Sequence, residues 1–129
     1  MKLTHLRQVA LGSSDLQKST EFYRDILGVE LLAEFLPNLV FFRLGSTRLL
    51  LEGPSSGSNA GGVLYFEVND IHAAHAELEQ RGVTFDSAPH VIHRDAAGTF
   101  GPAGGEEWMA FFRDPDGNVL ALAEFRLPT

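Results

Sequence analysis

The sequence has no cysteine among its 129 residues. Disulfides, thiolate nucleophiles and cysteine-bound metals are therefore excluded, and a reducing compartment is favoured. Basic residues are also few, because 10 Lys and Arg stand against 17 Asp and Glu and give a formal net charge of -7. A chain of that charge repels phosphate backbones, so we do not expect nucleic acid as a partner.

Long hydrophobic runs are absent too. One of the longest, Leu39-Val40-Phe41-Phe42, is far too short to cross a bilayer. The first residues, Met1 to His5, lack the apolar stretch that follows the charge in a secretory signal. We therefore expect a cytoplasmic protein that makes no membrane contact.

The sequence does contain an internal repeat. Residues 9–31 read VALGSSDLQKSTEFYRDILGVEL, and residues 64–85 read LYFEVNDIHAAHAELEQRGVTF. Each copy has an apolar strand, an Asp, a helical pattern, Gly-Val and a second strand, and the triplet Phe-Phe-Arg recurs at 41–43 and 111–113. Agreement in this order over both halves predicts two copies of one βαβββ unit.

The remaining elements follow from local patterns. Apolar segments predict strands at 30–36, 38–44 and 47–52 in the first copy, and at 83–86, 90–94, 107–113 and 118–125 in the second. Ser14 and Gln17 have the spacing of a helical capping box, and Asp70 can cap the second helix. We expect one domain over 1–129, with module one at 1–53, a linker at 54–62 and module two at 63–129.

A second loose stretch runs from Asp95 to Gly105 and contains four glycines. Loops of this length without regular structure are often lids or binding loops. We therefore expect this segment to close over a ligand.

Three segments carry a resemblance to a known family: Gln8-Val9-Ala10-Leu11, Phe22 to Gly28 (FYRDILG) and Phe112 to Asn118 (FRDPDGN). The chain resembles the glyoxalase / bleomycin-resistance / dioxygenase (vicinal oxygen chelate) superfamily over nearly its whole length. The resemblance implies an α+β fold in which two βαβββ modules form one curved, eight-stranded mixed sheet, a cup with its helices outside. In this superfamily the cup holds the active site, often around a divalent metal.

The resemblance also places metal ligands on the first and last strand of each module. Those positions hold Gln8, Leu49 or Leu50, Val63 and Ala121. Only the glutamine has a donor atom, and a divalent cation needs several. We therefore predict no metal cofactor. Glu52 reaches the cup only if the register shifts, and Glu124 faces away from it.

Other polar and aromatic side chains are candidates for the cup. Tyr65 shares its strand face with Val63, and Trp108 follows the glycine-rich loop. His90 and His93 face opposite sides of a regular strand, so without a bulge only one of them points into the cup. A purely structural role in packing would also explain the position of each of these side chains. The expected ligand-binding residues are Gln8, Tyr65, His90, His93, Trp108 and Glu52.

These expectations favour a protein that binds a small, partly aromatic molecule in the cup without the usual metal. The alternative is a lyase, isomerase or dioxygenase that uses an unconventional metal or a His/Tyr acid–base pair. A third possibility is an interaction module without a ligand. The sequence leaves open whether the chain catalyses a reaction. Strand edges at the module ends favour a homodimer.

Overall fold

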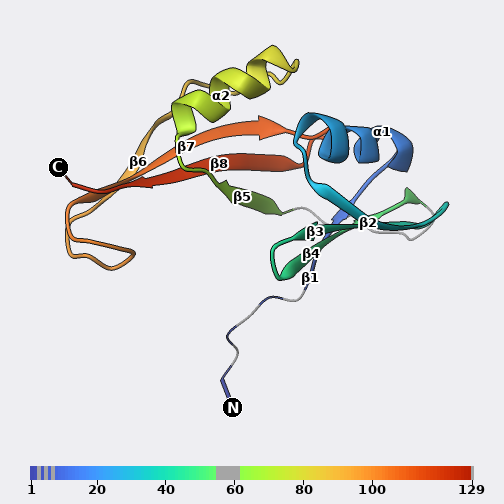
Figure 1. Cartoon of the computed structure of the whole chain (residues 1–129), viewed down its shortest axis with the longest axis horizontal. Helices are drawn as coiled ribbons and strands as arrows, with labels where there is room; N and C mark the ends of the chain where they lie inside the picture. The colour runs from blue at the N-terminus through green and yellow to red at the C-terminus, as the bar shows by residue number, and fades with distance from the viewer. Residues whose placement is uncertain (3, 5, 7, 55–61, 129) are drawn as a thin grey trace. The chain divides into compact units, whose positions relative to one another are not determined.

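The computed structural model describes the chain apart from residues 3, 5, 7, 55–61 and 129 (Figure 1). Contacts divide the chain into two compact units. The first unit comprises residues 1–62 and 114–118, and the second comprises residues 63–113 and 119–129. Most of the predicted linker at 54–62 lies outside the described residues. No helix within the described part of the chain is long and apolar enough to cross a membrane.

The first unit is a βαβββ module. Its elements are β1 (Gln8–Gly12), α1 (Leu16–Glu21), a π-helical turn η1 (Phe22–Ile26), β2 (Glu30–Phe35), β3 (Leu39–Leu44) and β4 (Thr47–Glu52). The strands form one sheet in the order β1-β4-β3-β2. Strand β1 runs parallel to β4, and the other neighbours are antiparallel.

The second unit repeats this topology. Its elements are β5 (Val63–Glu67), α2 (Ile71–Gln80), β6 (His90–Asp95), β7 (Gly105–Arg113) and β8 (Val119–Arg126). The sheet order is β5-β8-β7-β6, again with only the first pair parallel. The α+β class and the two βαβββ modules are therefore confirmed, and the eight strands lie four to a sheet.

The predicted strand at 83–86 is wrong. Phe85 makes one isolated bridge to Phe112, and the next strand, β6, begins only at His90. Pro89, just before it, has no N–H to donate to a ladder, so pairing stops between the bridge and β6.

The predicted capping box at Ser14 and Gln17 is also wrong, because α1 begins one residue later. Asp15 caps α1 by accepting the N–H of Lys18 at 3.1 Å. The equivalent Asp70 caps α2 by accepting the N–H of Ala73 at 3.1 Å, as predicted. The repeat itself, in which Asp15 matches Asp70, was the better guide to the helix start.

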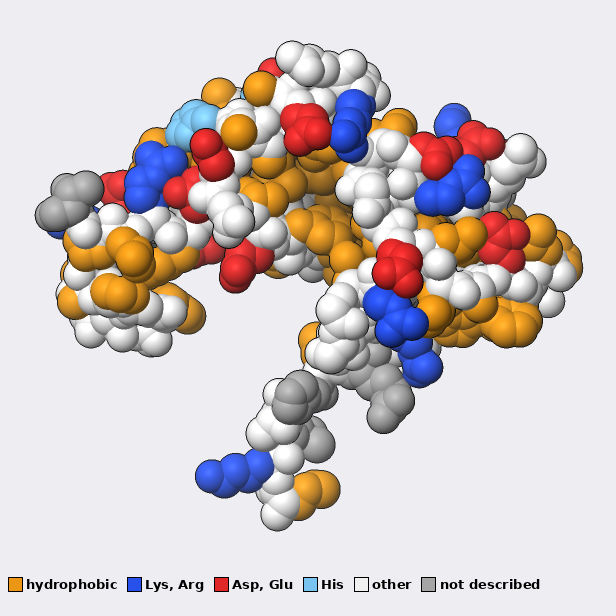
Figure 2. All heavy atoms as spheres, viewed as in Figure 1, with side chains coloured by type: hydrophobic (Ala, Val, Ile, Leu, Met, Phe, Trp, Pro, Cys, Tyr) orange, Lys and Arg blue, Asp and Glu red, His pale blue; other side chains and the backbone are white. Residues whose placement is uncertain are grey.

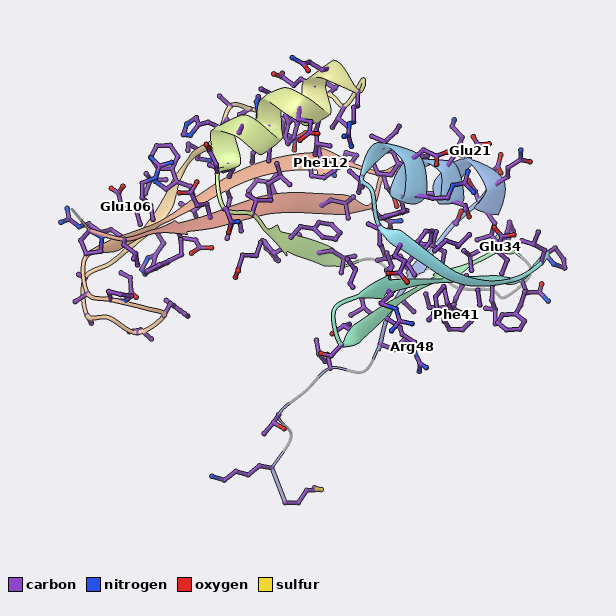
Figure 3. All side chains as sticks on the ribbon, viewed as in Figure 1. Glu21, Glu34, Phe41, Arg48, Glu106 and Phe112 are labelled. Carbon is purple, nitrogen blue, oxygen red and sulfur yellow. The ribbon has the colours of Figure 1, made fainter. Side chains whose placement is uncertain are left out.

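Each sheet has one face packed against its helix. In the first unit the buried residues on that face are Leu11, Val40, Phe42, Leu49 and Leu51. In the second unit they include Ala110, Phe112, Leu120 and Leu122, and Phe112 lies on the α2 side of the sheet in Figure 3. Because directly opposite residues share a face, the strand register defines the other side of each sheet.

We call these other sides the first and second open faces. The first open face carries Gln8, Ala10, Arg48, Leu50, Glu52, Phe41, Arg43 and Glu30. The second carries Val63, Tyr65, Glu67, Ala121, Ala123, Phe125, Phe111, Met109 and Glu107.

The Asp-Pro-Asp-Gly-Asn turn at 114–118 belongs to the first unit, although the strands flanking it belong to the second. The carboxylate of Asp114 accepts the hydroxyl of Tyr23 at 2.8 Å and the N–H groups of Asp116 and Asn118 at 2.9 Å. Asp116 in turn accepts the N–H of Ser14 at 2.8 Å. Burial, and then the charge of Asp114, raise the pKa of Tyr23 above its usual range, so its hydroxyl remains a donor.

Candidate ligand-binding site

The second unit contains a cavity of about 470 Å³. Its walls come from β6, β7, β8 and the loop between β6 and β7. The lining residues are Ile92, His93, Phe100, Glu107, Met109 and Phe125. Three of them, Glu107, Met109 and Phe125, lie on the second open face, so the cavity occupies the end of that face next to the loop.

A bulge in β6 determines how its histidines are placed. The register shifts between Val91 and His93, so that His90 lies opposite Met109 and His93 opposite Glu107. A regular strand would send the two histidines to opposite sides, whereas the bulge brings both into register with the second open face. The expectation that only one of them faces the ligand side held only for a strand without a bulge. His93 lines the cavity, while His90 is exposed with its Nδ1 atom 3.0 Å from the carbonyl oxygen of Ala88.

The loop between β6 and β7 is organised by one buried carboxylate. Asp95 is 2% exposed and accepts the N–H groups of Thr99 at 2.8 Å, Phe100 at 2.8 Å and Gly101 at 3.0 Å. Burial alone would raise the pKa of Asp95, but the three hydrogen bonds and the charge of His93 outweigh it, and the pKa is lowered.

This loop places an aromatic ring beside the cavity. Phe100 is 76% exposed, and its ring meets that of His93 edge to face with the centroids 5.9 Å apart. Figure 2 shows hydrophobic side chains gathered on the lobe that this loop forms. The loop predicted to cover a ligand thus contributes an apolar wall to the cavity.

Gly101 in this loop and Gly105 at the start of β7 allow another ring to approach closely. A Cβ atom added at Gly105 would lie 2.3 Å from the Phe125 ring, and one at Gly101 would lie 2.6 Å from it. Only glycine fits at such distances. The glycines that suggested a loose lid therefore also make room for Phe125 in the wall of the cavity.

Glu107 lines the cavity but is not among the ligand-binding residues expected from the sequence. Its side chain is half-buried, and burial raises its pKa. The carboxylate of Glu67 raises this pKa further, and His93 opposes the effect. The alternation of β7 offered a signal, because residues 107, 109 and 111 share one face while 106 and 108 share the other.

Trp108 lies on the face of β7 opposite the cavity. Its ring is 5.2 Å from that of His72 in α2, and the guanidinium carbon of Arg126 lies 4.3 Å from the ring centroid. Strand alternation turns Trp108 toward the helix, so it is not among the residues that line the cavity, and ligand binding by its side chain stays a prediction.

Three other predicted residues lie on the open faces but are not among the residues that line the cavity. Gln8 is exposed and opposite Arg48 at the start of β1. Glu52 shares that face in a regular register, without the shift that we expected to be necessary. Tyr65 is 55% exposed, with its ring 6.3 Å from that of Phe111. Ligand binding by these side chains stays a prediction.

The residues at the expected metal positions do not fit a divalent cation. Leu50 shares the open face with Gln8, whereas Leu49 faces the helix, so Leu50 is the first-module position. Val63 and Ala121 occupy the second-module positions and have no donor atoms. Within the described ranges, no group of three or more His, Cys, Asp or Glu is arranged to hold a metal. Glu124 points away and accepts the N–H of Ile71 at 2.9 Å.

A second, more polar groove of about 300 Å³ lies in the first unit between α1 and β2. Glu21 and Glu34 line it and are labelled in Figure 3. Arg24 lines it as well, but its guanidinium is paired with Asp25 at 2.7 Å. The first cavity, with its apolar walls and few polar groups, is the better candidate for an organic ligand.

Two βαβββ modules, each with one covered and one open sheet face, define the class of fold to which this protein belongs. The chain is a member of the Glyoxalase/Bleomycin resistance protein/Dioxygenase superfamily, whose profile matches residues 5–122.

Individual relatives differ in what they do. Mouse methylmalonyl-CoA epimerase is 33% identical over 100 residues, a match that spans 64% of this chain but only 56% of the epimerase. A lactoylglutathione lyase from Agrobacterium tumefaciens is 26% identical with a TM-score of 0.74, over 96% of each chain. TnmS3, an antibiotic-binding protein from Streptomyces sp. CB03234, is 27% identical with a TM-score of 0.74, over 97% of this chain and 98% of TnmS3.

Proposed function

We propose that this protein binds a small, partly aromatic molecule in the cavity of the second unit, without the divalent metal of its superfamily. The observation that carries the proposal is the cavity itself. Its walls are mainly apolar, and two of the lining residues, His93 and Glu107, are titratable and lie opposite each other on β6 and β7. Small-molecule sites commonly combine apolar walls with a few placed polar groups.

Each part of the cavity has a physical role in this proposal. Phe100, Met109 and Phe125 remove apolar ligand surface from water, and the Phe100 ring can stack against an aromatic group. His93 and Glu107 offer hydrogen bonds that orient the ligand. The raised pKa of Glu107 widens the pH range over which its carboxyl carries a proton and can donate as well as accept.

Two further observations support binding without a metal. Leu50, Val63 and Ala121 stand at three of the four superfamily metal positions and cannot coordinate a cation. The antibiotic-binding protein TnmS3 shares the fold over nearly the whole chain. The predicted homodimer stays a prediction.

An enzyme remains the second candidate. The position of His93 opposite Glu107 favours an enzyme, because two titratable groups at one site can move a proton between substrate atoms. The relatives that are named as an epimerase and a lyase support the same reading. Loss of turnover in H93A and E107Q, on a compound that the wild type converts, would establish this candidate.

The binding proposal is tested by thermal shift against a panel of aromatic compounds, followed by titration of the hits. A ligand of the folded state raises the melting temperature. We expect F100A to weaken binding of a hit by at least about fivefold, roughly 1 kcal/mol. The matched control L127A also removes an exposed apolar side chain of the second unit, since Leu127 is 59% exposed, and should stay within about twofold of wild type.

Two results would contradict the proposal. One is a panel in which no compound raises the melting temperature. The other is a hit that F100A and wild type bind equally well.

A further inference from the structure

A row of polar side chains crosses the first open face. Gln8 on β1 lies opposite Arg48 on β4, Arg48 lies opposite Arg43 on β3, and Arg43 lies opposite Glu30 on β2. All four strands of the sheet contribute one residue. The two arginines are thus neighbours at the middle of the row.

The arginines differ in their partners. The Nε atom of Arg43 donates to Glu30 at 3.2 Å, and its side chain is 53% exposed. The Nε atom of Arg48 is buried and has no hydrogen-bond partner among the described residues. A buried N–H without an acceptor is unfavourable, and such groups in folded proteins normally have a partner.

The surroundings of Arg48 suggest what its guanidinium group binds. Two residues along each strand, the same face carries the apolar side chains Ala10, Leu50 and Phe41. Figure 3 shows Phe41 and Arg48 on the side of the first sheet turned away from α1, and Figure 2 shows basic side chains gathered there. A ligand on this face would meet a guanidinium beside an apolar strip.

We propose that Arg48 binds the carboxylate or phosphate group of a small organic anion whose apolar part lies against Leu50 and Phe41. A guanidinium presents its N–H groups as a planar fork that matches both oxyanions. The amide of Gln8, opposite Arg48, can donate a further hydrogen bond. Glu30 neutralises Arg43, so Arg48 supplies the charge that attracts the anion.

This inference goes beyond the proposed function, because it concerns residues of the first unit and the cavity is built from the second. It also names a ligand chemistry that the cavity residues do not. A chain with a net charge of -7 repels anions in general. Binding of an anion would therefore be due to the local arrangement around Arg48.

The test uses the whole chain and three probes of similar size: benzoate, phenyl phosphate and neutral benzyl alcohol. NMR follows the Nε–Hε resonance of Arg48 at low ionic strength. We expect one or both anions to shift this resonance with saturation, and benzyl alcohol to leave it in place. A stronger shift by benzoate assigns a carboxylate ligand, and a stronger shift by phenyl phosphate assigns a phosphate.

Variants then separate the local site from the overall charge. R48Q should lower the affinity for the anion at least tenfold. The affinity of R48K should lie between those of R48Q and wild type, because lysine keeps the charge but lacks the planar fork of N–H groups. R81Q makes the same change of charge at the residue that follows α2, where Arg81 pairs with Glu77, and should remain within twofold of wild type. Melting curves show that each variant is folded, and R48K replaces R48Q if the latter is not.

The inference is overturned if R48Q binds the anions as tightly as wild type, or if R81Q loses as much affinity as R48Q. Binding of benzyl alcohol with the affinity of the anions would overturn it as well.

Discussion

Glu107 is a carboxylate in an unfavourable environment. Burial and the neighbouring charge of Glu67 both raise its pKa, and His93 offsets only part of the effect. A group in this position costs stability when it is ionised, and such residues are frequent at binding sites.

This loss of stability should be visible when the free energy of unfolding of E107Q is compared with that of wild type at different pH values. The raised pKa means that the folded state binds the Glu107 proton more tightly than the unfolded state, so wild-type stability falls as pH rises from about the ordinary value of 4.5 through the raised folded pKa. Glutamine does not titrate. The free energy of unfolding of E107Q relative to wild type should therefore increase over that range, as measured by urea denaturation from pH 4 to 7.5.

The matched control is E106Q, which removes a charge from the other face of the same strand. The free energy of unfolding of E106Q relative to wild type should not show the same increase with pH. A constant difference between E107Q and wild type across the range would show that Glu107 is not strained at this site.

The histidines mark the limit of sequence reasoning for single residues. Their alternation on β6 was read correctly for a regular strand, and the bulge between Val91 and His93 reversed the result. Trp108 is the opposite case, since β7 is regular there and alternation alone places its side chain on the face opposite that of Glu107. The face of the sheet on which a strand residue lies can be predicted only when the register of the neighbouring strand is known.

At the scale of elements, the loop between β6 and β7 depends on one side chain. The carboxylate of Asp95 accepts three consecutive backbone N–H groups, those of Thr99, Phe100 and Gly101. The loop thereby holds Phe100 beside His93, where the cavity needs it.

D95N should loosen this loop. An asparagine has one acceptor oxygen in place of two and carries no charge, so it cannot hold all three amides equally well. We expect amide hydrogen exchange at Thr99, Phe100 and Gly101 to become at least tenfold faster, and binding in the cavity to weaken. D86N, which alters an exposed carboxylate bound to Arg113 at 3.3 Å, is the control and should leave these amides unchanged. Unchanged exchange in D95N would show that the backbone holds the loop without this carboxylate.

The elements themselves were largely predictable, because the apolar patterns of helices and strands and the internal repeat all indicated the same elements. Six of the seven strand segments predicted after the two helices formed within one or two residues of their expected ends. The exception at 83–86 has the apolar character of a strand, but Pro89 interrupts the ladder beyond it. Short apolar segments do not reveal whether a partner strand lies alongside.

For the whole molecule, the two units do not coincide with the two repeats. Residues 114–118 come from the second repeat but lie in the first unit, where Asp114 accepts the hydroxyl of Tyr23. The sequence identified these residues as a turn and did not reveal their partners, because contacts between residues 91 positions apart leave no local pattern.

Y23F tests this connection. Removing the hydroxyl leaves the buried Asp114 carboxylate with one donor fewer, which should lower the free energy of unfolding by about 1–3 kcal/mol. Y65F makes the same chemical change at a tyrosine that is 55% exposed, and should remain within about 0.5 kcal/mol of wild type. Equal stability of Y23F and wild type in urea would argue against the bond between the turn and η1.

The placement of the 114–118 turn also bears on how the two repeats can vary in evolution. If they descend from one duplicated gene, their products are no longer separable, because a fragment ending at residue 62 would lack the carboxylates that Tyr23 and Ser14 use. A substitution at Asp114 would be inherited with the second repeat, yet its damage would fall on η1 of the first repeat, where Tyr23 lies. Recombination that exchanged only one half between relatives would therefore have to keep Tyr23 and Asp114 together.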